Sequence, residues 1–140
     1  MNKILGGLII VMALVIGIVP LFTDCQSQGR SLTTDAGKTV AMKCHWSAVA
    51  EIGVAVPLLL VGILTITSKR KETVRSLAAF GVTLGALAIL FPTALIGVCA
   101  SNMMICNMVM RPILILSGIV AIALSVIVAL RTRKGGELAA

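Results

Sequence analysis

Four long apolar segments divide the chain, and polar residues gather in the connections between them. The segments are residues 4–22, 47–67, 76–98 and 112–130. Because a helix rises about 1.5 Å per residue, about 20 residues cross a hydrocarbon layer of about 30 Å. Lipid offers no partner to backbone N–H and C=O groups, so each segment is expected to be helical. The pattern predicts an all-α membrane protein, with residues 1–140 forming a single four-transmembrane-helix bundle.

The first segment has features of a signal peptide, because Lys3 precedes a long apolar run. A cleavable signal usually has an apolar core of about 7–15 residues and a small-residue cleavage site. This core is longer, and the residues that follow it, 22–25, form no such site. We therefore expect an uncleaved membrane anchor.

Composition narrows the class of protein further. Hydrophobic residues make up 59% of the chain and charged residues only 12%, whereas a soluble domain carries about 25% charged residues. This balance excludes a soluble globular domain and a disordered chain. The net charge of +7 is not accompanied by a basic stripe with interleaved aromatic residues, so nucleic acid is not an expected partner.

The positive charges instead predict the orientation in the membrane, because Lys and Arg collect on the cytoplasmic side. Eight of the twelve cations lie at the chain ends or between the second and third segments: Lys3, Lys69, Arg70, Lys71, Arg75, Arg131, Arg133 and Lys134. The other four lie in two outer loops: Arg30, Lys38, Lys43 and Arg111. Both termini are therefore predicted to be cytoplasmic, in a multi-pass protein of the cell (inner or plasma) membrane.

The outer loops, 23–46 and 99–111, are expected to form a small extracytoplasmic cap. In the first loop, β-branched residues flank a turn at residues 35–38, which predicts a short β-hairpin. A lone hairpin is only marginally stable in water. It would therefore need a tether to the rest of the cap.

All four cysteines, Cys25, Cys44, Cys99 and Cys106, lie in these outer loops. An even number of cysteines on the oxidising side of a membrane indicates disulfides. One bond within each loop is the favoured pairing, and bonds between the loops are the alternative. A Cys99–Cys106 bond requires a nonhelical loop, because two helical turns would separate these residues by about 10 Å.

Two sequence blocks carry a resemblance to a known family. The first is Met-Lys-Cys-His-Trp at 42–46, followed by Ala-Glu-Ile-Gly at 50–53. The second is Phe-Pro-Thr-Ala-Leu-Ile-Gly-Val-Cys at 91–99, followed by Met-Ile-Cys-Asn at 104–107 and by Pro112. Over nearly the whole chain, this sequence resembles the small bacterial four-helix membrane proteins of domain-of-unknown-function family 4418. The resemblance implies four membrane helices and no established reaction. It also implies an accessory subunit, since family members resemble companions of exporter-type ABC transporters.

Several outer residues could bind a soft metal such as copper, because thiolate and thioether sulfur suit Cu(I). The candidate ligands are Met42, Cys44, His45, Met103, Met104 and Met108. The alternative is structural: the methionines fill gaps between loops and helix ends, and His45, the only histidine, bonds a loop carbonyl or caps a helix. Trp46 is interpreted as an interfacial anchor.

Glu51 lies about one turn inside the second segment. A carboxylate at that depth is costly and indicates function by default, as a proton or cation carrier. The favoured interpretation is an ion pair with His45, Lys43 or Arg111. In the third segment, Gly81 and Gly85 form a face of small residues, which serves either packing within the bundle or docking of a partner.

Three functions remain open at this point. The first is a noncatalytic accessory or structural subunit, partnered by a larger membrane protein or a second copy of the chain. The second is a membrane thiol–disulfide oxidoreductase of the quinone-linked kind, although neither loop has the Cys-x-x-Cys spacing of those enzymes. The third is a copper-binding protein or small transporter. No cofactor motif or catalytic constellation is found, so a noncatalytic role is expected.

Overall fold

The computed structural model describes residues 2–137 except 27–28, 30 and 99–102, and the side chains of those among residues 3–133. Its elements are α1 (Asn2–Thr23), β1 (Leu32–Thr33), β2 (Thr39–Val40), α2 (Lys43–Thr67), α3 (Lys71–Leu90), the π-helical turns η1 (Phe91–Leu95) and η2 (Cys106–Met110), and α4 (Arg111–Glu137).

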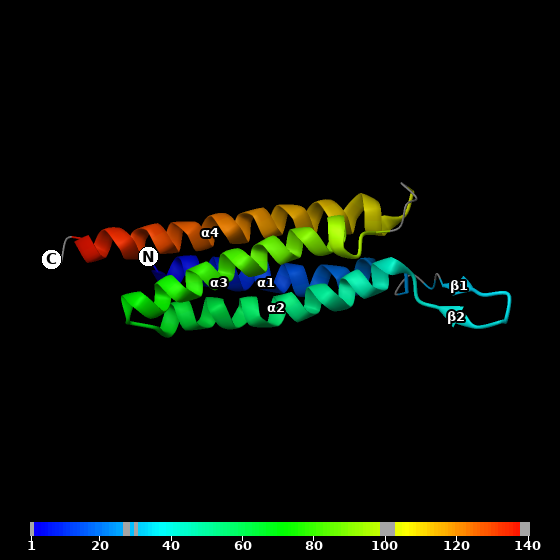
Figure 1. The fold of residues 1–140 in the computed structure, drawn as a ribbon, viewed down its shortest axis with the longest axis horizontal. Helices are drawn as coiled ribbons and strands as arrows, with labels where there is room; N and C mark the ends of the chain where they lie inside the picture. The colour runs from blue at the N-terminus through cyan, green and yellow to red at the C-terminus, as the bar shows by residue number, and fades with distance from the viewer. Residues whose placement is uncertain (1, 27–28, 30, 99–102, 138–140) are drawn as a thin grey trace.

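The four long helices form two antiparallel hairpins that lie side by side (Figure 1). Contacts are most extensive within each hairpin, between α1 and α2 and between α3 and α4. The hairpins meet through α2 with α3 and α1 with α4. The helices are therefore arranged around the bundle in chain order, with each helix touching the one before it and the one after it.

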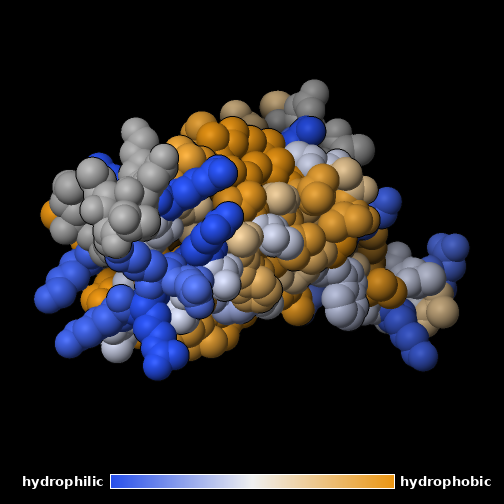
Figure 2. Space-filling model, turned by 60° about the vertical axis from the view of Figure 1, so that its left-hand side comes forward, coloured by the Kyte–Doolittle hydropathy of each residue, from blue (hydrophilic) through white to orange (hydrophobic). Residues whose placement is uncertain are grey.

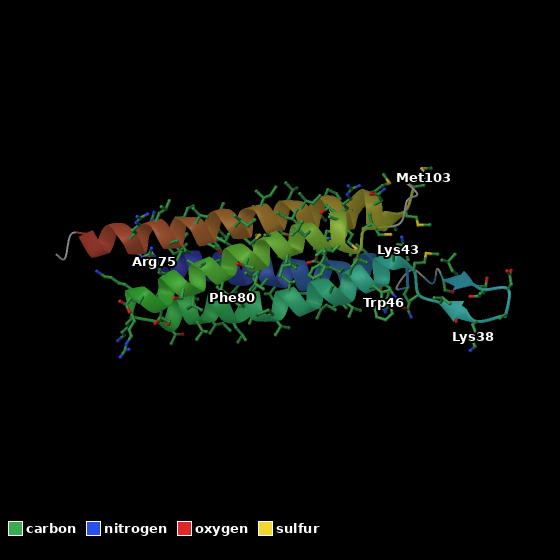
Figure 3. The ribbon with its side chains drawn as sticks, viewed as in Figure 1. Lys38, Lys43, Trp46, Arg75, Phe80 and Met103 are labelled. Carbon is green, nitrogen blue, oxygen red and sulfur yellow. A yellow bond between two sulfur atoms is a disulfide. The ribbon has the colours of Figure 1, made fainter. Side chains whose placement is uncertain are left out.

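The two ends of the bundle differ in character. The start of α1, the end of α4 and the α2–α3 connection lie at one end, which we call the basic end. The β-hairpin, η1 and η2 lie at the other end, the cysteine end (Figure 1). Figure 2 shows hydrophilic side chains gathered toward the ends and a hydrophobic belt between them. In Figure 3, Arg75 lies at the basic end, whereas Lys38, Lys43, Trp46 and Met103 lie toward the cysteine end.

Four helices are long and apolar enough to cross a membrane, over Lys3–Thr23, Lys43–Thr67, Lys71–Leu95 and Cys106–Arg133. Large apolar side chains stay exposed along all of them, as a bundle that faces lipid requires. The predicted fold class is confirmed: the chain is a multi-pass membrane protein with a four-helix bundle. The two-stranded hairpin in the first loop is also confirmed, with Leu32 paired to Val40 in antiparallel register.

Two helices begin four or five residues earlier than hydropathy predicted, α1 begins at Asn2 rather than at 4, and α4 continues to Glu137 rather than ending at 130. The helix α2 starts at Lys43 rather than at 47, and α3 starts at Lys71 rather than at 76. Apolar runs mark the part of a helix that lies in hydrocarbon. The helix itself continues where water can solvate charged side chains, so its ends lie beyond the run.

The third helix ends earlier than predicted, at Leu95 in η1 rather than at 98. Pro92 has no N–H to donate, which disturbs the regular helical ladder. The carbonyl of Phe91 instead accepts bonds from the N–H groups of Ile96 and Gly97, at 3.1 and 3.0 Å. Gly97 then adopts a φ of 76°, a left-handed conformation that ends the helix at little cost only for glycine.

A second π-helical turn joins the α3–α4 connection to α4. In η2 the N–H of Arg111 donates to the carbonyl of Cys106, and Pro112, which has no N–H, follows immediately. Consequently Cys106 belongs to the helical end of α4 and not to a free loop, as 99–111 was expected to be.

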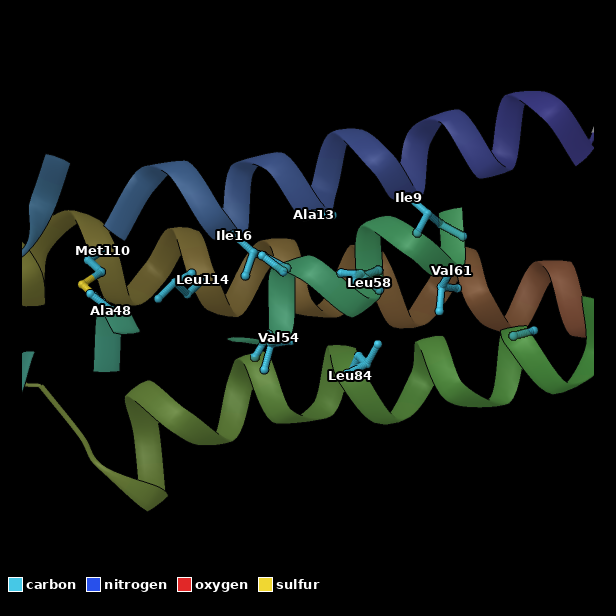
Figure 4. Packing of buried hydrophobic residues seen from close by; sticks show 14 of the residues in the cluster. Ile9, Ala13, Ile16, Ala48, Val54, Leu58, Val61, Leu84, Met110 and Leu114 are labelled. Atoms are coloured by element: carbon cyan, nitrogen blue, oxygen red, sulfur yellow. The ribbon is translucent and has the colours of Figure 1, made fainter. Parts of the chain in front are cut away.

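The bundle core is made of aliphatic and small side chains. Along α2 the buried positions recur every three or four residues, as on one face of a helix. Ile9, Ile16, Leu58 and Leu114 are among the largest fully buried side chains. Figure 4 shows these residues filling the space between the helices, with Met110 directed toward Ala48 near the cysteine end.

Each hairpin is held together by a pair of facing glycines. A Cβ atom built on Gly6 would lie 3.0 Å from the carbonyl oxygen of Gly62, and one on Gly85 would lie 3.1 Å from that of Gly118. Each glycine contacts an isoleucine of the facing helix. Within each helix, the glycine and the isoleucine that contacts the facing glycine are four residues apart in the sequence. The four pairs are Gly6 with Ile10, Gly62 with Ile66, Gly85 with Ile89, and Gly118 with Ile122.

The small-residue face of α3 therefore serves packing within the bundle. A Cβ atom on Gly81 would lie 2.5 Å from Ser125 Oγ, and Gly85 faces Gly118. Both contacts are with α4, so this face is covered and is not available for docking a partner.

We expect Gly62→Ala to destabilise the protein by about 1–3 kcal/mol, the usual cost of overpacking a close contact. The new Cβ would lie 2.6 Å from Ile10 Cγ1 and 3.1 Å from the backbone of Gly6. Gly53→Ala in the same helix is the matched control, because nothing lies within 4 Å of that position. Unfolding of the purified protein in detergent measures both, and equal stability of the two variants would contradict the glycine contact.

Candidate functional site

Three cysteine sulfurs meet in one cluster at the cysteine end. Cys25 and Cys44 form a disulfide, with their Cα atoms 6.3 Å apart, which confirms the pairing expected within the first loop. The Sγ atom of Cys106, 81 residues along the chain from Cys25, lies 3.1 Å from Cys25 Sγ. All three Sγ atoms lie within 4.8 Å of one another. We call these residues the sulfur cluster.

Each cysteine of the cluster is placed by a helix end. Cys25 follows α1 by two residues, Cys44 is the second residue of α2, and Cys106 opens the π-helical turn before α4. Their exposed fractions are 4%, 0% and 1%. Cys99 lies outside the described residues, so the expected bond between Cys99 and Cys106 stays a prediction.

A polar contact lies beside the disulfide. His45 Nδ1 is 3.0 Å from Asp24 Oδ2, so the neighbours of Cys25 and Cys44 in the sequence also pair with each other. Asp24 is 93% buried, and its carboxylate stands at the first turn of α2, where helix N–H groups favour negative charge. The expected pair between His45 and Glu51 is wrong, because His45 bonds Asp24 instead.

Sequence reasoning missed Asp24. The available signal was the mirrored order of two dipeptides, Asp24-Cys25 and Cys44-His45. When Cys25 and Cys44 pair across an antiparallel helical hairpin, the residue before the first cysteine and the residue after the second also lie opposite each other. These residues are Asp24 and His45.

A small cavity of about 60 Å³ reaches the sulfur cluster from the surface. This volume exceeds the roughly 10–15 Å³ that one water molecule requires. Four of the seven lining residues carry sulfur; the lining consists of Thr23, Asp24, Cys25, Met103, Met104, Ile105 and Cys106. Cys25 and Cys106 therefore border a space large enough for water although both are nearly buried.

The structure brings together only part of the predicted soft-metal set. Met103 and Met104 line the cavity, and Cys44 belongs to the sulfur cluster. Met42 packs against the core, and Met108 is 65% exposed and does not line the cavity.

The comparison with protein families gives one match. The family described as "Domain of unknown function (DUF4418)" matches residues 4–130. The chain belongs to this family. Searches of curated proteins and of solved structures returned no significant match. Membership confirms the resemblance drawn from the two sequence blocks and assigns no reaction.

In this DUF4418 protein the inward face of α2 carries polar groups below the sulfur cluster. Cys44, Ser47 and Glu51 follow one another at helical spacing, and all three are buried. Ser47 Oγ donates a 2.8 Å hydrogen bond to the carbonyl of Gly97. This bond ties α2 to the turn that follows η1.

Glu51 is fully buried, and its two carboxylate oxygens accept no hydrogen bond from the part of the chain that the structure describes. The expected ion pair with Lys43 or Arg111 is therefore also wrong. Both cations are exposed at the cysteine end, where water solvates them, whereas Glu51 faces into the bundle. A polar group buried without a partner is costly and is retained mainly for function.

We expect Glu51→Met in this DUF4418 protein to raise the free energy of unfolding by about 1–3 kcal/mol, the cost of burying an unpartnered polar group. Glu72→Gln, at an exposed position in the first turn of α3, is the control and should change stability by no more than about 0.5 kcal/mol. Unfolding in detergent measures both. Destabilisation by Glu51→Met would show that Glu51 forms a stabilising contact in the folded protein.

Proposed function

We propose that this protein exchanges thiols and disulfides at the outer face of the cell membrane. The observation that carries the proposal is the 3.1 Å approach of Cys106 Sγ to Cys25 Sγ while Cys25 is bonded to Cys44. Disulfide exchange requires one sulfur to attack another sulfur of a disulfide. Because Cys106 lies beside the Cys25–Cys44 disulfide, the proximity that exchange requires is already present.

The exchange step conserves atoms and electrons, and it starts from the form in which Cys106 is a thiol and is not bonded to Cys99. The thiolate of Cys106 attacks Cys25 Sγ, the Cys25–Cys44 bond breaks, a Cys25–Cys106 bond forms, and Cys44 leaves as a thiolate. Cys44 lies in the first turn of α2, and the positive end of a helix stabilises a thiolate there. Departure of Cys44 is therefore favoured over departure of Cys25.

Net oxidation of a substrate needs two further reactants. A dithiol outside the membrane, such as a cysteine pair of an exported protein, gives two electrons and two protons to the protein disulfide and becomes a disulfide itself. A lipid-soluble quinone then accepts two electrons and two protons from the protein dithiol. The cavity beside Cys25 and Cys106 is the access route for the substrate thiol.

The orientation that this function requires is the one that charge predicts. Hydrophilic side chains crowd the basic end (Figure 2). The cations that the sequence places there include Lys69, Arg70, Lys71, Arg75, Arg131 and Arg133, which supports cytoplasmic termini under the positive-inside rule. The cysteine end then faces the oxidising side of the membrane, where disulfides persist.

The exchange is tested by removing the leaving sulfur. We expect Cys44→Ser to accumulate a Cys25–Cys106 disulfide, because Cys25 Sγ keeps its near neighbour. Peptide mapping by mass spectrometry without reductant detects the new bond, and Cys106→Ser, which retains Cys25–Cys44, is the matched control. If Cys25 and Cys106 both remain open to alkylation in Cys44→Ser after mild oxidation, the proposal fails.

Turnover gives an independent measurement. Purified protein in detergent should oxidise a dithiol peptide in the presence of a short-chain quinone, and Cys25→Ser should abolish this activity. Resistance of all four wild-type cysteines to mild reductant, together with no quinone reduction, would overturn the assignment.

An accessory role beside a larger membrane protein, such as an ABC-type exporter, is the second candidate, and the β-hairpin favours it. All residues from 31 to 40 are exposed, and the hairpin projects from the bundle (Figure 1). Leu32 and Val40, which pair across the two strands, are 58% and 51% exposed. Apolar residues on a projecting hairpin are suited to contact with a partner outside the membrane.

This role predicts co-purification with a larger membrane protein in mild detergent, with a complex that weakens in the Leu32→Ser, Val40→Ser double variant. Thr33→Ser and Thr39→Ser together form the control, since they alter the same strands without changing apolar area greatly. Isolation of the wild-type protein as a monomer under these conditions would count against the role.

A further inference from the structure

We infer that the fully reduced protein binds one Cu(I) ion through the three thiolates of Cys25, Cys44 and Cys106. This metal site is a function separate from thiol exchange. It rests on the proposed exchange in one respect, because reaction with an external dithiol would open the Cys25–Cys44 disulfide in the cell. Two electrons and two protons from that dithiol convert Cys25–Cys44 to two thiols. Cu(I) then displaces the thiol protons, which pass to water.

The positions of the sulfur atoms fit a trigonal site. Metal–sulfur bonds of about 2.3 Å in a trigonal plane place the sulfur atoms about 4 Å apart. The three Sγ atoms here lie within 4.8 Å of one another. Once the disulfide is opened, Cys25 and Cys44 need only separate slightly, without movement of the helices that carry them.

The elements that carry the ligands hold them in place. Cys44 lies in the first turn of α2 and Cys106 in the hydrogen-bonded turn η2. The adjacent contact between Asp24 and His45 joins the end of α1 to α2, so Cys25 stays close to Cys44 when their bond is absent. A site whose ligands are already in position loses little entropy on binding.

The sulfur atoms of two methionines offer a route to the site. Met103 is 88% exposed, and Met104 is half-buried. Both line the cavity that also touches Cys25 and Cys106. Thioether sulfur binds Cu(I) more weakly than thiolate does, so it suits capture and transfer of the ion rather than final binding.

The donor set favours Cu(I) over Zn²⁺. Structural Zn²⁺ is almost always bound by four ligands in a tetrahedron, and His45, the only histidine, bonds Asp24. Among the residues that the structure describes, three sulfur donors share a nearly buried position, which matches the preference of soft Cu(I) for thiolate.

The test uses the full-length protein in detergent, reduced with a phosphine and transferred without oxygen into buffer free of reductant. Titration with Cu(I) against a chromogenic Cu(I) chelator should give one ion per chain and an ultraviolet thiolate-to-Cu(I) absorption band. Cys106→Ser should weaken binding by more than the roughly 10–100-fold that loss of an outer-shell partner costs. Its retained Cys25–Cys44 bond before reduction serves as the check that it has folded.

The role of the two methionines in delivering Cu(I) is tested with one variant at the cavity and one control variant outside it. The double variant Met103→Leu, Met104→Leu should slow transfer of Cu(I) from a weak donor several-fold and leave one ion bound per chain. Met108→Leu should change neither, because Met108 does not line the cavity.

Failure of the metal site is distinguishable from failure of exchange. Absence of stoichiometric Cu(I), equal affinity in Cys106→Ser, or preference for Zn²⁺ in direct competition would each overturn the inference. The formation of Cys25–Cys106 in Cys44→Ser involves no metal, so it reports on exchange alone. Conversely, chemical reduction supplies the fully reduced protein whether or not the protein exchanges with a substrate.

Discussion

The requirement that backbone groups find hydrogen-bond partners within lipid governs the rest of this structure. It makes each apolar segment helical. Wherever a helix is interrupted, the backbone groups that lose their partners must find others. Interruptions occur at the cysteine end, where Pro92 and Pro112 have no N–H to donate. Two π-helical turns lie at or next to these prolines, a feature often found at functional sites, whereas Pro20 and Pro57 lie within the α-helices α1 and α2. One of the π-helical turns holds Cys106 against Cys25, so the sulfur cluster depends on how the bundle accommodates its prolines.

Two kinds of contact set the geometry of the hairpins. Facing glycines bring the helices of each hairpin together, near the start of α1 in the first hairpin and nearer the cysteine end in the second. At the cysteine end of the first hairpin, the Cys25–Cys44 bond and the Asp24–His45 contact join α1 to α2. The first hairpin is thus held at both ends. Cys25 and Cys44 are therefore held in fixed positions by the first hairpin, and Cys106 is contributed by the second hairpin.

Sequence patterns predicted the architecture well and the side-chain partners poorly. The four helices, the short β-hairpin and the disulfide of the first loop were all predicted and are present. The ends of α2 and α3 were displaced, because hydropathy locates hydrocarbon and not helix termini. The pairing expected for Glu51 is absent, because the inward rotation of α2 buries Glu51 while leaving Lys43 exposed. Charge and proximity along the chain gave no information on that rotation.

The sequence by itself determined that this is a four-helix membrane protein with all its cysteines at one end. An apolar run of about 20 residues has essentially one stable outcome in lipid, and the order of loops then assigns each polar segment to a side. Only the tertiary structure decided which cysteines meet, that Asp24 is the partner of His45, and that Glu51 is buried. Those outcomes depend on the rotation and close approach of helices, which are set by packing between residues far apart in the chain, such as Cys25 and Cys106.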